Sequence, residues 1–450
     1  MQRSMKSSSE RGSALVVAIA LMMLLAMIPV ALQMVQTTAQ DTQAQIHQST
    51  EADNAARAGL QDAISWFQRQ QCQPVRQSCS GTYTYPDMAF NPQYPADTQD
   101  ATCSPGPCSI GIVNEFALDP DLGLWARYEV RQQAVGATNA NAVHDVSDER
   151  VPTASGVGNT QVGTGLAWYI QSKGTIYWKR NPALAYNVSP NRVVGNATAA
   201  TELRRLALVL PGNAALIVND QSKVTLSNSG RAVGGTVGAG VGYFTGATQP
   251  NVDGQTGTNS QNGSYFTGTP NILSVLAGGN TFVSDVGIFG MTQQNLKLLA
   301  DYVVPNVASL PPTYPRLAIV YINGDADFAA RTPLNGSGIL YVNGNLTIEA
   351  ANNAFFSGVI FATGKITIHG PASINGAVIS AACPGPSSGV GSGLCNNGDG
   401  LVTASPYVLI DGSAGAAQVA YDNNTLNSMR LTLANYREDK AAYYTFSSLK

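Results

Sequence analysis

Residues 14–32 read ALVVAIALMMLLAMIPVAL, a stretch without a single charged side chain. An apolar helix of about 20 residues spans the hydrocarbon core of a bilayer, so this stretch predicts a transmembrane helix. Arg3, Lys6 and Arg11 precede it, and these cations place the short N-terminal segment on the cytoplasmic side.

Helical spacing continues beyond the apolar stretch. A sparse apolar stripe extends to Phe67 among Gln, Thr, Asp and Arg residues. We therefore expect one helix over residues 13–71, with a kink at Pro29, whose ring cannot continue the helical hydrogen-bond ladder. The amphipathic half must bury its stripe, and one face of an antiparallel sheet would cover it. A secretory signal peptide has a shorter apolar region, whereas a plain membrane anchor remains an alternative.

The sequence around this helix resembles a known family. A basic leader, then RGSALVV at residues 11–17, then an apolar helix that becomes amphipathic, resembles a type IV prepilin. The resemblance implies cleavage by a prepilin peptidase between Gly12 and Ser13, followed by methylation of the new N-terminus. The missing Phe after Gly12 and the EADNAARAGL stretch at residues 51–60 resemble PilX-type minor pilins.

One position departs from the major pilins, which carry a Glu at the fifth mature position. This chain has Val17 there. Burying a charge in a helical bundle is costly unless the charge is paired, so a subunit without a neighbour beyond it is better off without the Glu. The departure resembles minor pilins at the tip and pseudopilins, with a tolerated variant at Val17 as the alternative. Val17 and Pro29 are the candidate assembly residues.

Composition favours an extracellular, β-rich protein. The 450 residues include 45 Gly, only 12% are charged, and the net charge is −3. The hydrophobic fraction of 44% excludes a disordered chain, and bulk charge gives no support to nucleic-acid binding.

The cysteines form local pairs that predict structural disulfides, with the connectivity left open. They are Cys72, Cys79, Cys103, Cys108, Cys383 and Cys395. Their spacing is not that of a zinc site, and the three histidines are far apart, so we expect no metal and no cofactor.

A repeat identifies the second half of the chain. Similar strand-and-turn units end at Gly324, Gly344 and Gly364, a spacing of twenty residues. Such a period with short strands and Gly turns predicts a β-solenoid, with Tyr321, Tyr341 and Phe361 stacked inside. Residues 215–226 and 283–289 are expected to add irregular coils, residues 234–281 to form extended loops, and residues 429–433 to form a strand.

The expected class is therefore α+β: a long N-terminal pilin helix packed on an antiparallel sheet, followed by a β-solenoid of about 20 residues per coil. The expected divisions are a leader (1–12), the pilin helix (13–71, with 14–32 transmembrane), a disulfide-stapled loop region (72–123), the antiparallel sheet (124–210), the solenoid with loop insertions (211–406) and C-terminal strands or a cap (407–450).

Signatures of catalysis are scarce. The chain has no zinc-protease motif and no phosphate-binding loop. Asp325 and Asp327 could form a carboxylate pair, but the acidic pattern does not persist in the next units, so solvated turn residues are favoured. Aromatic residues in the Gly- and Asn-rich loops are candidates for ligand contact, with coverage of the solenoid flank an equal alternative. They are Tyr243, Phe244, Tyr265 and Phe266.

These observations predict a non-enzymatic minor pilin of a type IV pilus, at or near the tip, whose solenoid recognises an external ligand. The arrangement resembles solenoid-bearing minor pilins of the ComZ-like group, a resemblance that implies a role in DNA uptake, and adhesion is a comparable hypothesis. The expected partners are other pilins, the prepilin peptidase, the inner membrane before assembly, and extracellular DNA or a surface glycan. The alternatives are a membrane-anchored β-helical carbohydrate enzyme and a type II secretion pseudopilin.

Overall fold

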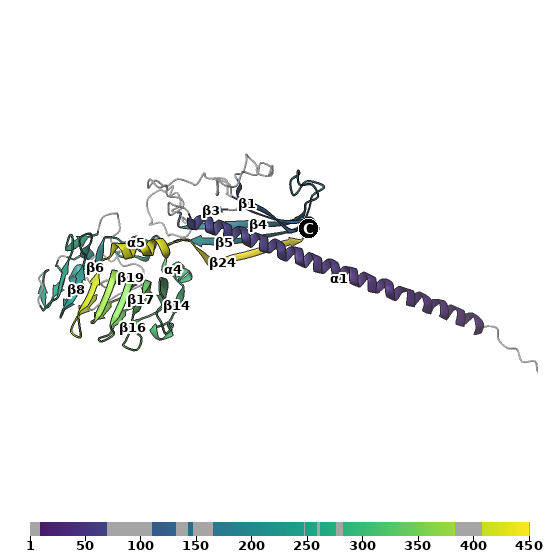
Figure 1. Ribbon diagram of the computed structural model, residues 1–450. Coiled ribbons are helices and arrows are strands. Elements are labelled where there is room, and N and C mark those ends of the chain that lie inside the picture. The colour runs from purple at the N-terminus through teal and green to yellow at the C-terminus, as the bar shows by residue number, and fades with distance from the viewer. Residues whose placement is uncertain are drawn as a thin grey trace, which may run out of the picture.

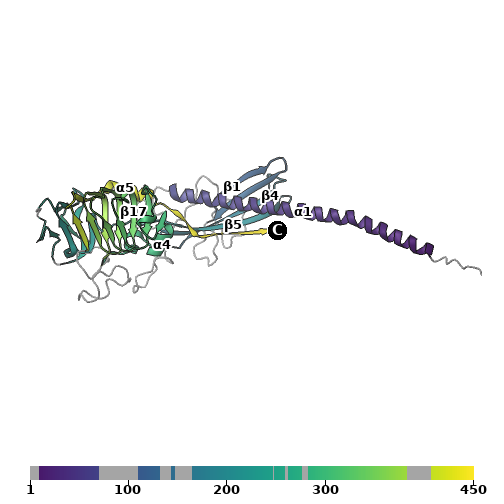
Figure 2. The same cartoon turned by 90° about the horizontal axis from the view of Figure 1, so that it is seen from below.

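The computed structural model describes residues 10–69, 110–131, 143–146, 165–246, 248–258, 262–275, 282–382 and 407–449. The helix α1 (Glu10–Arg69) lies along an antiparallel sheet with its C-terminal part and extends far beyond it with its N-terminal part. A stack of short parallel strands lies at the opposite end of the molecule (Figures 1 and 2).

The N-terminal sheet has the strand order β1-β2-β4-β5-β24, with β3 also paired to β4. Its strands are β1 (Ile110–Asp119), β2 (Leu124–Arg131), β3 (Val143–Asp145), β4 (Ala167–Trp178), β5 (Arg192–Arg204) and β24 (Arg437–Leu449). All pairs are antiparallel. The expected loop region 72–123 was thus too long, because β1 begins at Ile110 and pairs with β2.

Small residues allow α1 to lie close to this sheet. Ala52 and Ala56 are fully buried, and a Cβ atom at Gly174 of β4 would clash with the helix backbone at both. At the end of the helix, the ring of Phe67 contacts Trp168, with centroids 5.3 Å apart. Full burial of such a large apolar side chain contributes about 1.5–3 kcal/mol, so this end of α1 is held firmly.

The solenoid comprises strands β6 to β23, with helical segments packed at its side. Its first strands are β6 (Ala214–Asp220), β7 (Val224–Ser227), β8 (Gly230–Val233), β9 (Ala239–Thr245), β10 (Asn251–Val252), β11 (Gln255–Thr256), β12 (Tyr265–Thr267) and β13 (Ile272–Ser274). The helices are η1 (Gln221–Lys223), α3 (Asp285–Phe289), α4 (Gln293–Leu299), η2 (Val307–Ser309) and α5 (Asn423–Thr432).

The remaining strands complete the stack. They are β14 (Tyr302–Val304), β15 (Ala318–Ile322), β16 (Ala326–Phe328), β17 (Asn335–Val342), β18 (Leu346–Ile348), β19 (Ala354–Ala362), β20 (Ile366–His369), β21 (Ala372–Ser380), β22 (Val408–Asp411) and β23 (Ala417–Ala420). Ile319 pairs with Ile339, and Ile339 with Val359, so the predicted twenty-residue repeat is observed here. The next step, Ile360 to Val378, is two residues shorter.

The predicted aromatic stack exists, but helix α3 covers it. Tyr321, Tyr341 and Phe361 are buried, with centroids 5.0 and 4.9 Å apart along the stack. Phe289 of α3 contacts both Tyr341 and Phe361, and the Tyr341 hydroxyl donates a hydrogen bond to Asp285 at 3.0 Å. The stack is therefore sealed by side chains that lie outside the repeat itself.

The strands do not follow one another in chain order. One ladder runs β14-β15-β17-β19-β21-β6-β9-β13, and a second runs β16-β18-β20-β22-β7-β10-β11. The chain thus enters in the middle of the stack with β6, winds to the distal end at β13, and returns through α3 and α4 to the proximal end at β14. It then winds back, so that β22 and β23 share a coil with the entry strand β6.

The expected α+β class is wrong. The described residues are mainly β-structure, and the two largest sheets are formed by the solenoid, in which most pairs are parallel. The prediction underestimated the strand content, because the sequence repeats regularly only around Gly324, Gly344 and Gly364, and residues 234–281, which contain further solenoid strands, resemble loops in composition.

Three local expectations also need correction. Residues 283–289 contain helix α3 rather than a solenoid coil, because the Ser284 side chain caps the helix by accepting a hydrogen bond from the backbone of Gly287. Residues 234–281 contain β9 to β13 rather than extended loops alone, because several of their glycines mark close backbone approach. A Cβ atom at Gly240, for instance, would lie 2.9 Å from the carbonyl oxygen of Ala232. Residues 429–433 belong to α5 and its C-cap rather than to a strand, since Leu426 and Met429 lie one turn apart on its buried face.

Among the residues whose side chains the structure describes, no helix is long and apolar enough to cross a membrane. Most side chains of the expected transmembrane segment, residues 14–32, lie outside that set.

Candidate functional site

The solenoid is inserted between two neighbouring strands of the N-terminal sheet. Strand β5 ends at Arg204, strand β24 begins at Arg437, and these two residues are paired across the ladder. The connections that leave and re-enter the sheet therefore lie side by side. This arrangement places the whole solenoid beyond one end of the sheet (Figure 2).

A buried charge cluster marks this junction. Arg204 forms ion pairs with Asp439 at 2.6 Å and with Glu202 at 3.5 Å, and all three side chains are nearly inaccessible to solvent. The Arg204 guanidinium also donates a hydrogen bond to Asn295 of α4 at 2.8 Å. Arg204 on β5 therefore contacts both the edge strand β24, through Asp439, and helix α4 of the solenoid, through Asn295.

More contacts fix the two connecting segments. The backbone N–H groups of Ala207 and Val209 donate to the carbonyls of Phe289 and Ile288 in α3. Arg437 pairs with Asp301 at 2.7 Å, and Asp301 in turn accepts a hydrogen bond from the backbone of Ile319. The junction is therefore a packed, multiply bonded interface rather than a flexible linker.

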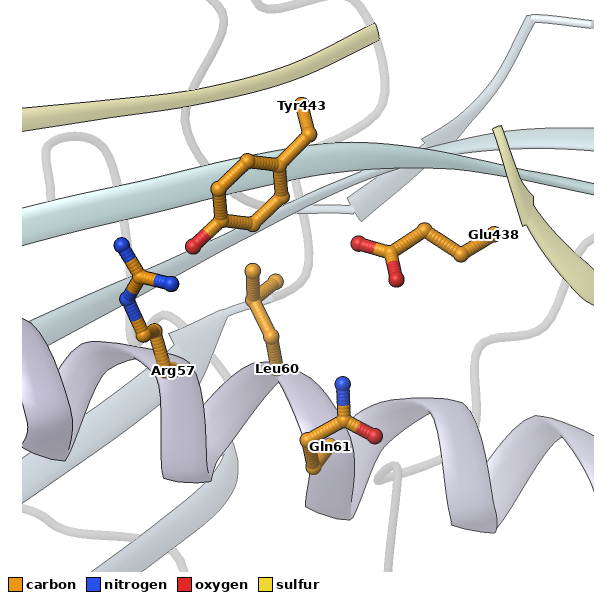
Figure 3. A pocket seen from close by; sticks show the side chains of 5 residues that line it. All are labelled: Arg57, Leu60, Gln61, Glu438 and Tyr443. Carbon is orange, nitrogen blue, oxygen red and sulfur yellow. The ribbon is translucent and has the colours of Figure 1, made fainter. Parts of the chain in front are cut away.

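A small pocket lies between α1 and the edge strand β24 (Figure 3). Its volume is about 340 Å³, and it is lined by Arg57, Leu60, Gln61, Glu438 and Tyr443. The Arg57 guanidinium lies over the Tyr443 ring at 5.3 Å. The hydroxyl of Tyr443 is buried without a hydrogen-bond partner among the described residues, so the pocket can accommodate a polar group.

The pKa values of Arg57 and Tyr443, which line this pocket, are both raised by their surroundings. The Arg57 guanidinium donates a hydrogen bond to the Asp53 carboxylate at 2.8 Å, and this contact raises the pKa of the guanidinium. Burial raises the pKa of the Tyr443 hydroxyl above its ordinary value. Both groups therefore keep their protons at neutral pH, with Arg57 charged and Tyr443 neutral.

A polar cluster lies at one corner of the solenoid. Asp411 accepts hydrogen bonds from Ser413, Asn228, His369 and Ser227. Burial alone would raise the pKa of this carboxyl, but these donors outweigh that effect and hold the pKa at about 2. The cluster joins β20, β22 and β7, that is, coils from both halves of the solenoid chain.

The aromatic candidates lie in strands rather than in loops. Phe244 and Phe266 are buried in the solenoid core, so the expectation that they contact a ligand is wrong. Tyr243 in β9 and Tyr265 in β12 are partly exposed, and Arg231 lies over the Tyr265 ring at 5.4 Å. Of these four aromatic residues, Tyr243 and Tyr265 remain candidates for ligand contact.

Asp325 is a structural turn residue. Its carboxylate accepts hydrogen bonds from the backbone and the side chain of Asn345 in the next coil. Asn345 accepts one from the backbone of Lys365 in the same way. Within the described part of the chain, no group of three His, Cys, Asp or Glu side chains is arranged to hold a metal ion.

The other candidate residues are not tested by side-chain geometry. Gly12, Ser13, Val17 and Pro29 lie within α1, but nothing is described of their side chains. The six cysteines lie outside the described residues, so the predicted disulfides remain predictions.

Sequence reasoning missed the junction cluster. Arg204 and Asp439 are more than two hundred residues apart, and nothing in the local pattern connects them. The one signal in the sequence was that charged residues such as Glu202 and Arg204 stand within a predicted strand, although only 12% of the residues of the chain are charged.

Comparisons with known proteins add little to this geometry. No protein-family model matches the chain, and no curated protein matches it. Among solved structures it is similar to the competence-associated pilin ComZ from Thermus thermophilus, with 11% identity, a TM-score of 0.21, and coverage of 90% of this chain and 98% of that chain. This weak likeness to a pilin identifies neither a family nor a function.

Proposed function

We propose that this chain is a minor pilin of a type IV pilus that presents its β-solenoid to an external ligand, for DNA uptake or for adhesion. In this proposal the N-terminal part of α1 holds the chain in the bacterial inner membrane until a prepilin peptidase cuts after Gly12. The processed chain then enters the pilus, at or near the tip, and contacts other pilins through α1.

The observation that carries the proposal is the division of the molecule along its length. The N-terminal part of α1 projects from one end of the sheet, and the solenoid projects from the other (Figure 2). A subunit held in a helical bundle by its N-terminal half would therefore expose the solenoid away from the bundle. The firm junction at Arg204 supports this, because it keeps the solenoid in a defined direction.

Mass spectrometry of the N-terminus tests the proposal on protein purified from its own cells. The expected chain begins at Ser13 with a methylated amine, and it appears in the fraction of pili sheared from the cell surface. A Gly12→Glu variant should accumulate uncut in the membrane fraction, whereas Ser8→Ala in the same leader serves as a matched control and should be processed normally. An intact Met1, or a cut beyond Leu32, contradicts the proposal.

A further inference from the structure

A straight row of outward side chains crosses one face of the solenoid. Successive register pairs place them side by side on β17, β19, β21, β23, β8 and β12, in the order Asn335, Phe355, Ser373, Gln418, Arg231 and Tyr265. On β19, β21, β23, β8 and β12, the residue that follows the row in sequence is buried, as in Phe356, Ile374 and Val419. The alternation shows that the row points to solvent and its neighbours point to the core.

The row carries aromatic rings and unpaired polar groups. Phe355 is 50% exposed, which is unusual for a large apolar side chain on a regular strand. The Tyr265 ring lies at the other end, flanked by the Arg231 guanidinium. Between them, the side chains of Ser373 and Gln418 have no hydrogen-bond partner among the described residues, so their hydroxyl and amide are available to a ligand.

The spacing of the row suits an extended polymer with a short repeat. Neighbouring strands lie about 4.8 Å apart, so six strands span about 24 Å. An extended polysaccharide advances by a comparable length per pyranose ring. It can therefore place one ring over each side chain, with apolar ring faces on Phe355 and Tyr265 and hydroxyls on Gln418 and Ser373.

Charge argues against a nucleic acid on this face. A protein gains affinity for DNA by neutralising phosphates with several Lys or Arg side chains. The row contains a single cation, Arg231, which already lies over the Tyr265 ring. The parallel row beside it, on the same strands, is uncharged throughout: Ser337, Ser357, Asn375, Ala420, Val233 and Thr267.

We propose that this row, from Asn335 to Tyr265, is a binding site for an extended, neutral polysaccharide that lies along the solenoid axis. The inference depends on the proposed function, since it names the ligand that the solenoid would recognise. Helix α5 stands beside the site, because Thr425 lies within hydrogen-bond distance of Ser357 in the neighbouring row, at 3.4 Å. Helix α5 therefore borders the row from Asn335 to Tyr265 on one side and leaves that row exposed.

Calorimetric titration of the full chain, purified in detergent micelles, tests the site. The probes are cellohexaose, N-acetylchitohexaose and mannohexaose, with single- and double-stranded DNA oligonucleotides for comparison. We expect at least one hexasaccharide to bind, and Phe355→Ala or Gln418→Ala to weaken it by about tenfold or more. Phe116→Ala is the matched control, because Phe116 is 37% exposed on β1 of the N-terminal sheet, far from the row.

Three results would overturn the inference. They are a failure of all three hexasaccharides to bind, binding that survives both Phe355→Ala and Gln418→Ala, and DNA binding that is lost in Arg231→Ala without any saccharide binding. Thermal melts of each variant establish that the chain is folded. Because the titration does not require cleavage after Gly12, a processed pilin without saccharide binding would refute this inference alone.

Discussion

Replacing Arg204 by Ala should be among the most damaging single changes at the junction. The substitution removes the partner that lies 2.6 Å from Asp439 and 3.5 Å from Glu202. The Asp439 side chain is only 2% exposed, so water cannot take the place of the guanidinium. A buried carboxylate is then left without its main counter-charge.

The structure sets the size of the effect. Removing one partner of a buried ion pair typically costs about 3–5 kcal/mol, and loss of the hydrogen bond to Asn295 adds to this. Arg437→Ala is the matched control at the same junction. Its ion pair with Asp301 is equally short at 2.7 Å, but the two side chains are 25% and 37% exposed. Solvent screens such a pair, so we expect its loss to cost about 0–1 kcal/mol.

Urea unfolding followed by tryptophan fluorescence measures this difference. The four tryptophans, at positions 66, 125, 168 and 178, all lie in α1 and the N-terminal sheet, so the signal reports on the module that contains Arg204. We expect the unfolding midpoint to fall much further for Arg204→Ala than for Arg437→Ala. The double variant Arg204→Met with Asp439→Leu should recover most of the loss. Equal midpoints for the two single variants would refute the reasoning.

Three other changes test the fold. Gly174→Ala should destabilise the α1–sheet interface by about 1–3 kcal/mol, because the new methyl group meets the helix backbone at Ala52; an unchanged urea midpoint would contradict this close packing. Phe361→Ala should cost about 3–5 kcal/mol in thermal unfolding, because it breaks the stack with Tyr341, while the exposed Phe355→Ala should cost far less; similar melting temperatures would contradict the buried stack. The free energy of unfolding of the wild type should fall by about 2 kcal/mol as the pH falls from about 4 towards 2, because the folded-state pKa of Asp411 lies below its ordinary value. The stabilisation by this carboxylate is therefore present above the ordinary pKa and is lost as the carboxylate is protonated in the folded state. Asp411→Asn should reduce this acid-dependent loss in pH-dependent thermal melts, and an unchanged loss would count against the cluster.

The sequence predicted those features that depend on short-range periodicity. The spacing of Gly324, Gly344 and Gly364 reappears as the register that pairs β15, β17 and β19. The part of the predicted stripe from Ala55 to Phe67 reappears as the buried face of α1, whereas Ile46 at its start is 60% exposed. Both follow from local geometry, in which each side chain repeats with the period of its own helix or coil.

Features that join distant segments could not be predicted in this way. Phe244 and Phe266 stand among Gly, Thr and Asn residues, and their surroundings read as loops, yet parallel pairing with strands elsewhere in the solenoid buries them. The partners of Arg204 likewise come from β24 and α4. A hydropathy pattern contains no information about which remote strand supplies a neighbour.

The order of the solenoid strands follows from the insertion itself. A solenoid wound in one direction leaves its two ends at opposite faces of the stack, and the ladder from β14 to β13 spans seven strand spacings, or about 34 Å. The adjacent strands β5 and β24 cannot accept connections that far apart without long linkers. Entry at β6 in mid-stack, with return through α3 and α4, brings entry and exit into the one coil that β6 shares with β22 and β23. The permuted winding is thus the solution that lets a long solenoid grow from neighbouring strands while both of its connections remain short.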